Sequence, residues 1–249
     1  MSHRVACAAF VLVAVSAGAI AQTTGPADED RRIAASLAAM LLAGQTVISN
    51  EQARINDPAI GPKGLDGATV LAKAVEIYKQ TDGADPESLD PASRQGRLLR
   101  EEMAAIKTVT DANQATIDAK GLAFKGFIPA VFARLVSEDF SRRAAGEAEM
   151  RATAPLSLVR NRKARPDAWE TSVIETRFLN AQWPRGQSYE ARVDDAGHTI
   201  FRIAVPEYYV ASCLSCHGTP RGETDITGYP KEGAALGDLG GVISIKLAQ

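Results

Sequence analysis

Hydrophobic residues in the first half of the chain recur every third or fourth position, the spacing of helices that bury one side. Acidic residues at 28–30 suit the N-terminal end of the first helix, and Pro129 is tolerated in the first turn of the last. The pattern predicts helices over 29–54, 67–79, about 91–109 and 128–143, with loops at 60–66 and 81–91. The side chains expected to face the core are Ile33, Leu37, Met40, Leu41, Val47, Ile48, Val70, Leu71, Ala74, Ile77, Leu98, Leu99, Met103, Ile106, Ile128, Phe132, Leu135, Val136 and Phe140.

Beyond residue 150 the hydrophobic period shortens to two. Segments 189–193, 199–205 and 241–247 alternate as half-buried strands do, and 156–159 and 173–178 are short and strand-like. Helices followed by strands predict an α+β fold with an antiparallel sheet. Because no repeat and no long linker divides the chain, we expect residues 29–249 to form a single domain.

The N-terminus has the three-part layout of a secretory signal peptide. A basic start is followed by the apolar run 5–15 and by Ala19-Ile20-Ala21, a small-x-small cleavage site. An uncleaved anchor helix is the alternative, but the apolar stretch is short for a bilayer. We therefore expect a signal peptide over 1–21, a flexible lead-in over 22–28 and a periplasmic protein with no membrane span after cleavage.

Composition narrows the classes of function. The chain has 249 residues, of which 45% are hydrophobic, with 28 Lys+Arg against 30 Asp+Glu. These values fit a folded protein, and a net charge of −2 gives no general attraction to nucleic acid. No nucleic-acid partner is expected. Of the three cysteines, Cys7 leaves with the signal peptide, so Cys213 and Cys216 remain.

Cys213-Leu214-Ser215-Cys216-His217 is a C-x-x-C-H motif, the attachment sequence for c-type haem. Two thiols three residues apart can each form a thioether with one vinyl group of a porphyrin. The helical turn between them places the next imidazole beneath the iron. The motif predicts one covalent haem c bound through Cys213 and Cys216, with His217 as the iron ligand.

Three other uses of this motif fit less well. A redox-active C-x-x-C usually follows a buried strand within a βαβ unit, a pattern that the sequence does not show. Structural zinc takes four ligands, and the only other histidine outside the signal peptide is His198, at an unhelpful spacing. A lone C-x-x-C disulfide closes too small a loop to stabilise much.

The surroundings of the motif resemble a family of exported single-haem c-type proteins with a PAS-like fold. The similar segments are 125–130, 158–170, 213–218, 225–230 and 237–244. The resemblance implies long N-terminal helices followed by a PAS-like antiparallel sheet that carries a covalent haem. Family members occur alone or as sensor halves of receptors and histidine kinases.

The sixth iron ligand stays open. Some relatives use an additional cysteine on an early helix, but here both remaining cysteines are expected to become thioethers. The candidates are His198, Met40, Met103, Met150, Lys125 or a water molecule. His198 stands in a hairpin-turn context, and each methionine fits the core equally well.

Several other residues have two interpretations. Arg160, Arg162, Lys163 and Arg165 form a solvated loop, or they pair with haem propionates or dock an acidic redox partner. The carbonyl of Pro220 or Pro230 could orient the second nitrogen of His217. Trp169 and Trp183 fit packing beside a macrocycle or an ordinary core.

One-electron transfer through a single haem is the favoured function. The alternative is a haem-based redox or gas sensor that acts through a separate protein, and a peroxidase-like enzyme is a weaker third. The expected partner is a redox protein or a membrane signalling protein. No Ser/His/Asp set, carboxylate pair or Walker motif marks another enzyme class.

Overall fold

The computed structural model describes residues 26–82, 84–195 and 197–248. The predicted signal peptide, 1–21, and the first part of the predicted lead-in lie outside these residues. Helix α1 begins at Pro26, three residues before the predicted start at Glu29. The two acidic residues of its first turn, Asp28 and Glu29, stand where the helix dipole favours negative charge.

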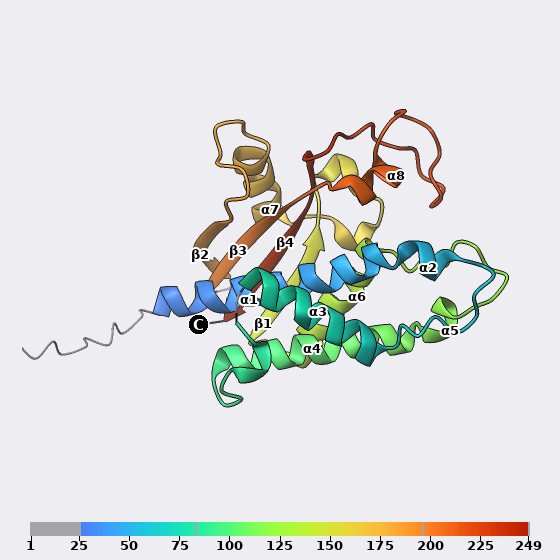
Figure 1. Ribbon diagram of the computed structural model, residues 1–249. Helices are drawn as coiled ribbons and strands as arrows, with labels where there is room; N and C mark the ends of the chain where they lie inside the picture. Colours follow the sequence, from blue (N-terminus) through green and yellow to red (C-terminus); the bar gives the residue numbers. More distant parts are fainter. Residues whose placement is uncertain (1–25, 83, 196, 249) are drawn as a thin grey trace, which may run out of the picture.

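All four predicted helices are confirmed, with shifted ends (Figure 1). The predicted helix 29–54 is broken at Glu51, because one short turn separates α1 from α2. A second short helix, α5, follows the third long one after Asn113. The helices of this half are α1 (Pro26–Asn50), α2 (Gln52–Asn56), α3 (Gly67–Asp82), α4 (Arg94–Ala112), α5 (Gln114–Ile117) and α6 (Pro129–Arg143).

A four-stranded antiparallel sheet follows the helices, which confirms the α+β prediction. The strands are β1 (Ala148–Thr153), β2 (Tyr189–Asp195), β3 (His198–Tyr208) and β4 (Leu239–Ala248), in the order β1-β4-β3-β2. Strands β2, β3 and β4 correspond to predicted segments. Strand β1 does not, because its sequence AEMRAT has no aromatic residue and only one β-branched residue, Thr153, and its pairing with β4 makes it a strand.

Two predicted strands are wrong. Segment 156–159 contains a 3₁₀ turn, Leu156–Leu158, and segment 173–178 continues helix α7 (Ala168–Val173) as a π-helical turn, Ile174–Phe178. Asp167 and Glu170 form a capping box that starts this helix. A short apolar run cannot by itself distinguish a strand from a buried helical turn, and here the cap decides.

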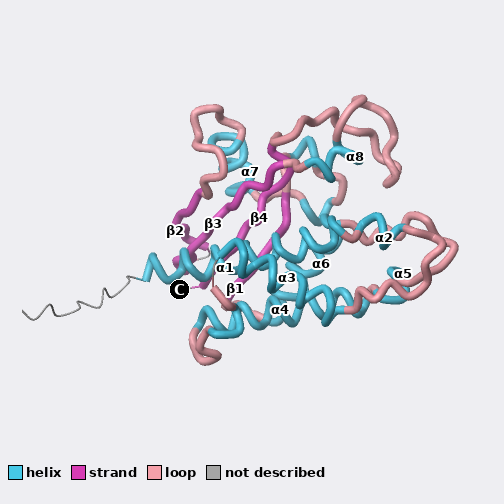
Figure 2. Tube along the Cα trace, in the orientation of Figure 1, coloured by secondary structure: helices cyan, strands magenta, loops and turns pink. Residues whose placement is uncertain are grey.

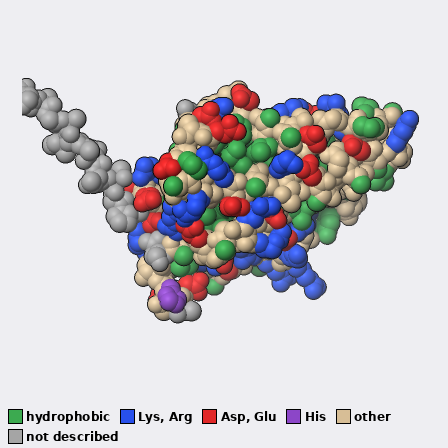
Figure 3. Space-filling model, turned by 90° about the horizontal axis from the view of Figure 1, so that it is seen from below, with side chains coloured by type: hydrophobic (Ala, Val, Ile, Leu, Met, Phe, Trp, Pro, Cys, Tyr) green, Lys and Arg blue, Asp and Glu red, His purple; other side chains and the backbone are tan. Residues whose placement is uncertain are grey.

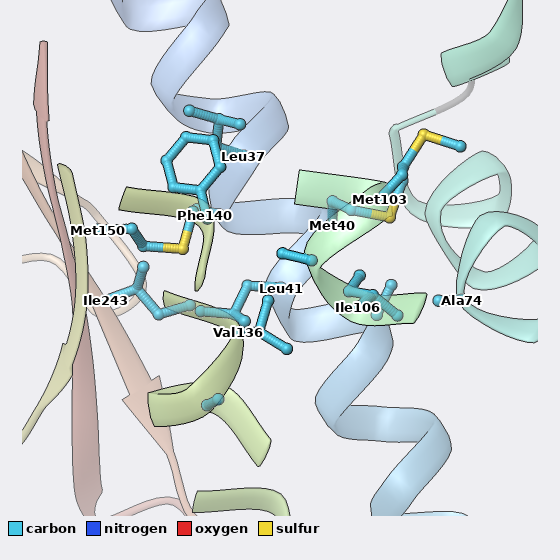
Figure 4. Packing of buried hydrophobic residues seen from close by; sticks show 14 of the residues in the cluster. Leu37, Met40, Leu41, Ala74, Met103, Ile106, Val136, Phe140, Met150 and Ile243 are labelled. Carbon is cyan, nitrogen blue, oxygen red and sulfur yellow. The ribbon is translucent and has the colours of Figure 1, made fainter. Parts of the chain in front are cut away.

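Helix α1 lies at the centre of the molecule, between the sheet and helices α3 and α4, and α6 packs against both α1 and strand β1 (Figure 4). Ile203 of β3 and Ile245 of β4, which pair across the sheet, belong to this core. On the opposite face of the sheet, Ala204 and Val242 pack against α7 in a smaller cluster. Both faces of the central strands are therefore covered.

Most side chains predicted to face the core are buried. Four of them, Leu71, Ile77, Ile128 and Leu135, stay half-exposed. On α3 the buried face is completed by Val75 and Tyr78, so that helix is turned slightly from the predicted orientation.

One described helix, α1, is long and apolar enough to cross a membrane over Asp28–Asn50, by length and composition alone. In the fold, 61% of its most apolar window is buried among the other elements. The same apolar surface therefore serves as packing surface in this structure.

Candidate functional site

The C-x-x-C-H motif stands where strand β3 leaves the sheet. A 3₁₀ turn, Ala211–Cys213, leads directly into the short helix α8, Leu214–His217 (Figure 1). The amide of Gly218 closes this turn by donating to the carbonyl of Leu214 at 2.9 Å. Cys213, Cys216 and His217 thus stand at i, i+3 and i+4 of one helical turn, where side chains share a face.

Both cysteines are free, half-buried thiols. In the described part of the chain, no three His, Cys, Asp or Glu side chains form a group that could hold a metal ion by themselves. The two thiols lie three residues apart on one turn, which is the spacing that two thioether bonds to a haem would need.

His217 is oriented by a carboxylate and a tyrosine. Its Nδ1 lies 2.8 Å from Oε2 of Glu232 and 3.2 Å from the hydroxyl of Tyr209. The imidazole also stacks on the Tyr209 ring, with the ring centroids 4.8 Å apart. Because the carboxylate can only accept, Nδ1 carries the proton, and Nε2 has no hydrogen-bond partner among the described residues.

The predicted partner of His217, a carbonyl of Pro220 or Pro230, is therefore wrong. The contact is made by Glu232, which lies two residues beyond Pro230. Burial alone would raise the pKa of the Glu232 carboxyl, but hydrogen bonds from His217 and Arg160 outweigh that effect and lower the pKa below its usual value. Glu232 is consequently an anion beside the imidazole.

Arg160 ties together the segments that surround the motif. Its Nη2 donates to the carbonyl of Cys216 at 3.1 Å and to Glu232 at 2.9 Å, and its Nη1 donates to Asp225 at 2.6 Å. The pKa of Asp225 is lowered because hydrogen bonds from Thr227 and Arg160 outweigh the effect of burial. Arg160 is thus engaged within the protein, which argues against its predicted pairing with propionates.

The other three cations of this run form an exposed turn. Arg162, Lys163 and Arg165 are exposed, and the turn Arg162–Ala164 rests on β1 through the bond from Thr153 to the carbonyl of Ala164 at 2.8 Å. The interpretation of this run as a solvated loop holds for these three residues.

A long loop between α8 and β4 closes over the motif (Figure 2). The amide of Ala234 donates to the carbonyl of His217 at 2.8 Å, and the amide of Gly233 donates to the carbonyl of Gly218 at 3.1 Å. Tyr209 binds the far end of the loop through two backbone hydrogen bonds with Gly237 and Asp238. The loop therefore brings Glu232 to His217 and Asp225 to Arg160, although neither pair is adjacent in sequence.

A cavity of about 450 Å³ lies between α1, α3 and β3. Thr46 of α1 and Val205 of β3 line it. Each of these two elements extends from the cavity toward the motif. Ser49, one turn beyond Thr46, lies 3.0 Å from Ser212 (Oγ to Oγ), and Val205 is followed by Glu207 on β3 and by Tyr209 directly after that strand. A cavity of this size is in the range that holds small molecules and cofactors.

Glu207 stands on β3 between this cavity and the motif. Its side chain keeps some exposure, but desolvation raises the pKa of its carboxyl to about 7, against the opposing effect of a hydrogen bond with Gln45 of α1. The charge beside the cavity therefore changes around neutral pH.

The residues proposed as a sixth ligand are dispersed. His198 begins β3, and the 11 residues of that strand separate it from the motif, roughly 30 Å at the usual rise per residue. The buried Met40, Met103 and Met150 pack in the core (Figure 4). The ammonium of Lys125 donates to the carbonyl of Leu122. None of these side chains contacts the motif, so the structure does not favour any of them.

The two tryptophans pack against the smaller hydrophobic cluster, on the face of the sheet that α7 covers. Trp169 is covered by the guanidinium of Arg202, 4.2 Å from its ring centroid, and Trp183 packs against Tyr189 with the centroids 5.9 Å apart. Their packing on this face agrees with the core interpretation.

Together, fold and site define an α+β protein in which an antiparallel sheet, covered by helices, extends into a C-x-x-C-H turn. The sequence pattern of the Tll0287-like family matches residues 86–248, which is more than half of the chain. The protein therefore belongs to the Tll0287-like family. No curated protein and no solved structure matches the chain.

Proposed function

We propose that this protein is an exported c-type haem protein that carries one electron through a single haem. Cys213 and Cys216 would hold the group covalently, and Nε2 of His217 would bind its iron. The membership in the Tll0287-like family is consistent with a haem-binding protein. The predicted signal peptide supports export to the periplasm, where such attachment takes place.

The orientation of His217 is the observation that carries this proposal. An imidazole that ligates iron donates its other ring N–H to a carboxylate or a carbonyl, which fixes the tautomer and the plane of the ring. The Nδ1 of His217 has such a partner in Glu232, at 2.8 Å. The residues present therefore fit a haem at this turn.

The protein's own residues would bind and shield the group. The bound haem would supply reversible one-electron chemistry at its iron. The cavity of about 450 Å³, which Leu42, Ile203 and Val205 line, would offer apolar surface to the group between α1 and β3. Such surface excludes water and helps to set the potential at which an electron is held.

The first experiment tests covalent attachment. The wild-type protein is expressed in cells that export it to a periplasm with haem-attachment machinery. On a denaturing gel, we expect it to give a band that stains for haem. Cys213→Ser and Cys216→Ser should each weaken that band, because each removes one thioether. Ser215→Ala, between the two cysteines, is the control and should stain like the wild type. Full staining in both cysteine variants would contradict the proposal.

A haem-based redox or gas sensor that acts through a separate protein is the second candidate. The observation that favours it is the placement of His198 and the three methionines away from the motif. A displaceable sixth position would suit ligand sensing. Carbon monoxide separates the two functions: a reduced spectrum that ignores the gas supports electron transfer, whereas a shifted spectrum supports the sensor.

We further propose that the redox partner presents an acidic surface. The exposed turn with Arg162, Lys163 and Arg165 follows Arg160, whose guanidinium donates to the carbonyl of Cys216 at 3.1 Å. Positive charge on this turn would steer an acidic protein toward this part of the molecule. A membrane signalling protein is the partner that the sensor would require.

A further inference from the structure

Arg160 and Glu232 form a relay that ends on His217. We propose that Arg160 is a positioning residue that holds the Glu232 carboxylate on Nδ1 of His217, and that this contact lowers the reduction potential of the bound haem. This inference rests on the proposed haem function. It adds the residues that would set the potential, which neither the motif nor the family assigns.

The contacts between Arg160 and Glu232 fix the carboxylate from one side. Nε of Arg160 lies 3.0 Å from Oε1 of Glu232, and Nη2 lies 2.9 Å from Oε1 and 3.1 Å from Oε2. The same Oε2 lies 2.8 Å from the imidazole Nδ1. Glu232 is thus held between a guanidinium and an imidazole.

Arg160 is itself held from behind. Asp225 accepts from its Nη1 at 2.6 Å, and the Asp225 side chain is completely buried. The ring of Tyr229 lies beneath the guanidinium, with the Cζ atom of Arg160 5.3 Å from the ring centroid. Side-chain exposures of 19% for Arg160 and 20% for Glu232 leave little water to screen or replace these bonds. A planar fork with several donors can make all of these contacts at once, and an ammonium cannot.

A carboxylate that accepts the Nδ1 proton increases the electron density of the imidazole. A more electron-rich ligand stabilises oxidised iron relative to reduced iron, so the reduction potential falls. Replacing the carboxylate by a neutral amide removes most of this effect. The potential of a Glu232→Gln variant should therefore rise.

The positive charge of Arg160, taken alone, acts in the opposite direction. A nearby cation disfavours the additional positive charge of oxidised iron, so losing that cation would lower the potential. Loss of the positioning role would raise it, because Glu232 would leave Nδ1. The Arg160→Lys variant keeps the charge and loses the fork, and hence isolates the positioning role.

The experiment measures midpoint potentials of the haem-loaded full-length protein. We expect Glu232→Gln to change the ratio of reduced to oxidised haem at fixed potential about tenfold, a rise of about 59 mV for one electron. Arg160→Lys should shift the potential in the same direction. The double variant should match Glu232→Gln alone, because Arg160 acts through Glu232. Arg162→Lys, an exposed arginine two residues away, is the matched control and should leave the potential unchanged.

A second measurement reports on the imidazole directly. The hyperfine-shifted proton NMR signals of the His217 ring, in the oxidised haem-loaded protein, should move in the same direction in Glu232→Gln and in Arg160→Lys. Thermal unfolding of the same samples shows whether they fold. If Arg160→Lys does not fold, Arg160→Gln takes its place with the signals of the His217 ring as its readout, because the loss of the cation would by itself lower the potential.

The outcomes separate this inference from the proposed function. An unchanged or lower potential in a folded, haem-loaded Arg160→Lys protein would overturn the positioning role. An unchanged potential in Glu232→Gln would overturn the whole relay. A wild-type protein that binds no haem would instead overturn the proposed function.

Discussion

Gly218 occupies a position where no side chain fits. A Cβ at this residue would stand 2.5 Å from the carbonyl oxygen of Leu214, the atom that accepts the Gly218 amide. A clash with backbone cannot be relieved by rotating a side chain. The turn that presents Cys213, Cys216 and His217 therefore depends on this glycine.

We predict that Gly218→Ala opens the turn, decreases haem staining of the protein and lowers its unfolding free energy by about 1–3 kcal/mol, the range for overpacked sites. Haem staining and urea unfolding check this prediction. Gly61→Ala is the control, since no atom lies within 4 Å of its Cβ position. Equal effects of the two substitutions would show that the turn tolerates a side chain.

At the residue scale, the sequence identified site residues only where they form a contiguous motif. Cys213, Cys216 and His217 could be named because their spacing is itself the signal. Glu232 could not, since it contacts His217 from 15 positions away and only the loop between them brings it back. Nothing in the sequence marked Tyr209 either, although it stacks on the imidazole.

Helix α4 buries a carboxyl in its packing surface. Both oxygens of Glu102 lack a hydrogen-bond partner among the described residues, and the residue is 0% exposed. Burial raises the pKa of this carboxyl well above its usual value of 4.5. The folded protein therefore retains a proton that the unfolded chain releases as the pH rises.

This difference makes stability depend on pH. Because the folded-state pKa is the higher one, the stability of the wild type falls as the pH rises above about 4.5 toward the folded-state pKa. Replacing Glu102 by an apolar side chain of similar volume removes the free-energy cost of burying this carboxyl. We predict that Glu102→Met stabilises the protein by about 1–3 kcal/mol at pH 8 and by less at pH 5.

Urea unfolding of both proteins at the two pH values checks this prediction. Glu101→Met, the preceding residue on the same helix, is the control, since the Glu101 side chain is 44% exposed. It should give no comparable gain at pH 8. A gain from Glu102→Met that is equal at both pH values would contradict the raised pKa.

At the element scale, long periodic segments were predictable and short ones were not. The four long helices could be predicted from repeated apolar positions, because in a long helix many apolar residues recur on the same buried face. The strand predicted over 173–178 was wrong because an apolar run of that length is compatible with a strand and with a helical turn equally. Strand β1 was missed because its pairing with β4, almost 100 residues further along the chain, gives it its structure.

Charge is unevenly distributed over the whole molecule. Figure 3 shows Lys and Arg interspersed with Asp and Glu over one face of the molecule. Ion pairs such as Arg97 with Glu147 compensate one another. The turn with Arg162 and Arg165 differs, because both side chains are exposed and no ion pair holds either of them among the described residues. A net charge of −2 thus conceals a local positive surface on the turn that follows Arg160.

This distribution predicts a charge-dependent rate of electron exchange. At low ionic strength, Arg162→Glu should slow the oxidation of the reduced protein by anionic iron–EDTA roughly twofold or more, and should accelerate oxidation by a cationic cobalt complex. Stopped-flow absorbance measures both rates. Lys120→Glu, an exposed lysine after α5, is the matched control with the same change in net charge. Equal effects of the two substitutions would argue against a localised docking surface.

The sequence by itself determined the helical half, three of the four strands and the C-x-x-C-H turn, because periodicity and contiguous motifs are local properties of the chain. The tertiary structure decided the partner of His217, the relay through Arg160, the cavity between α1 and β3, and the separation of His198 from the site. These features join positions far apart along the chain. Their energies depend on burial and distance, which exist only once the sheet and the helices have packed together.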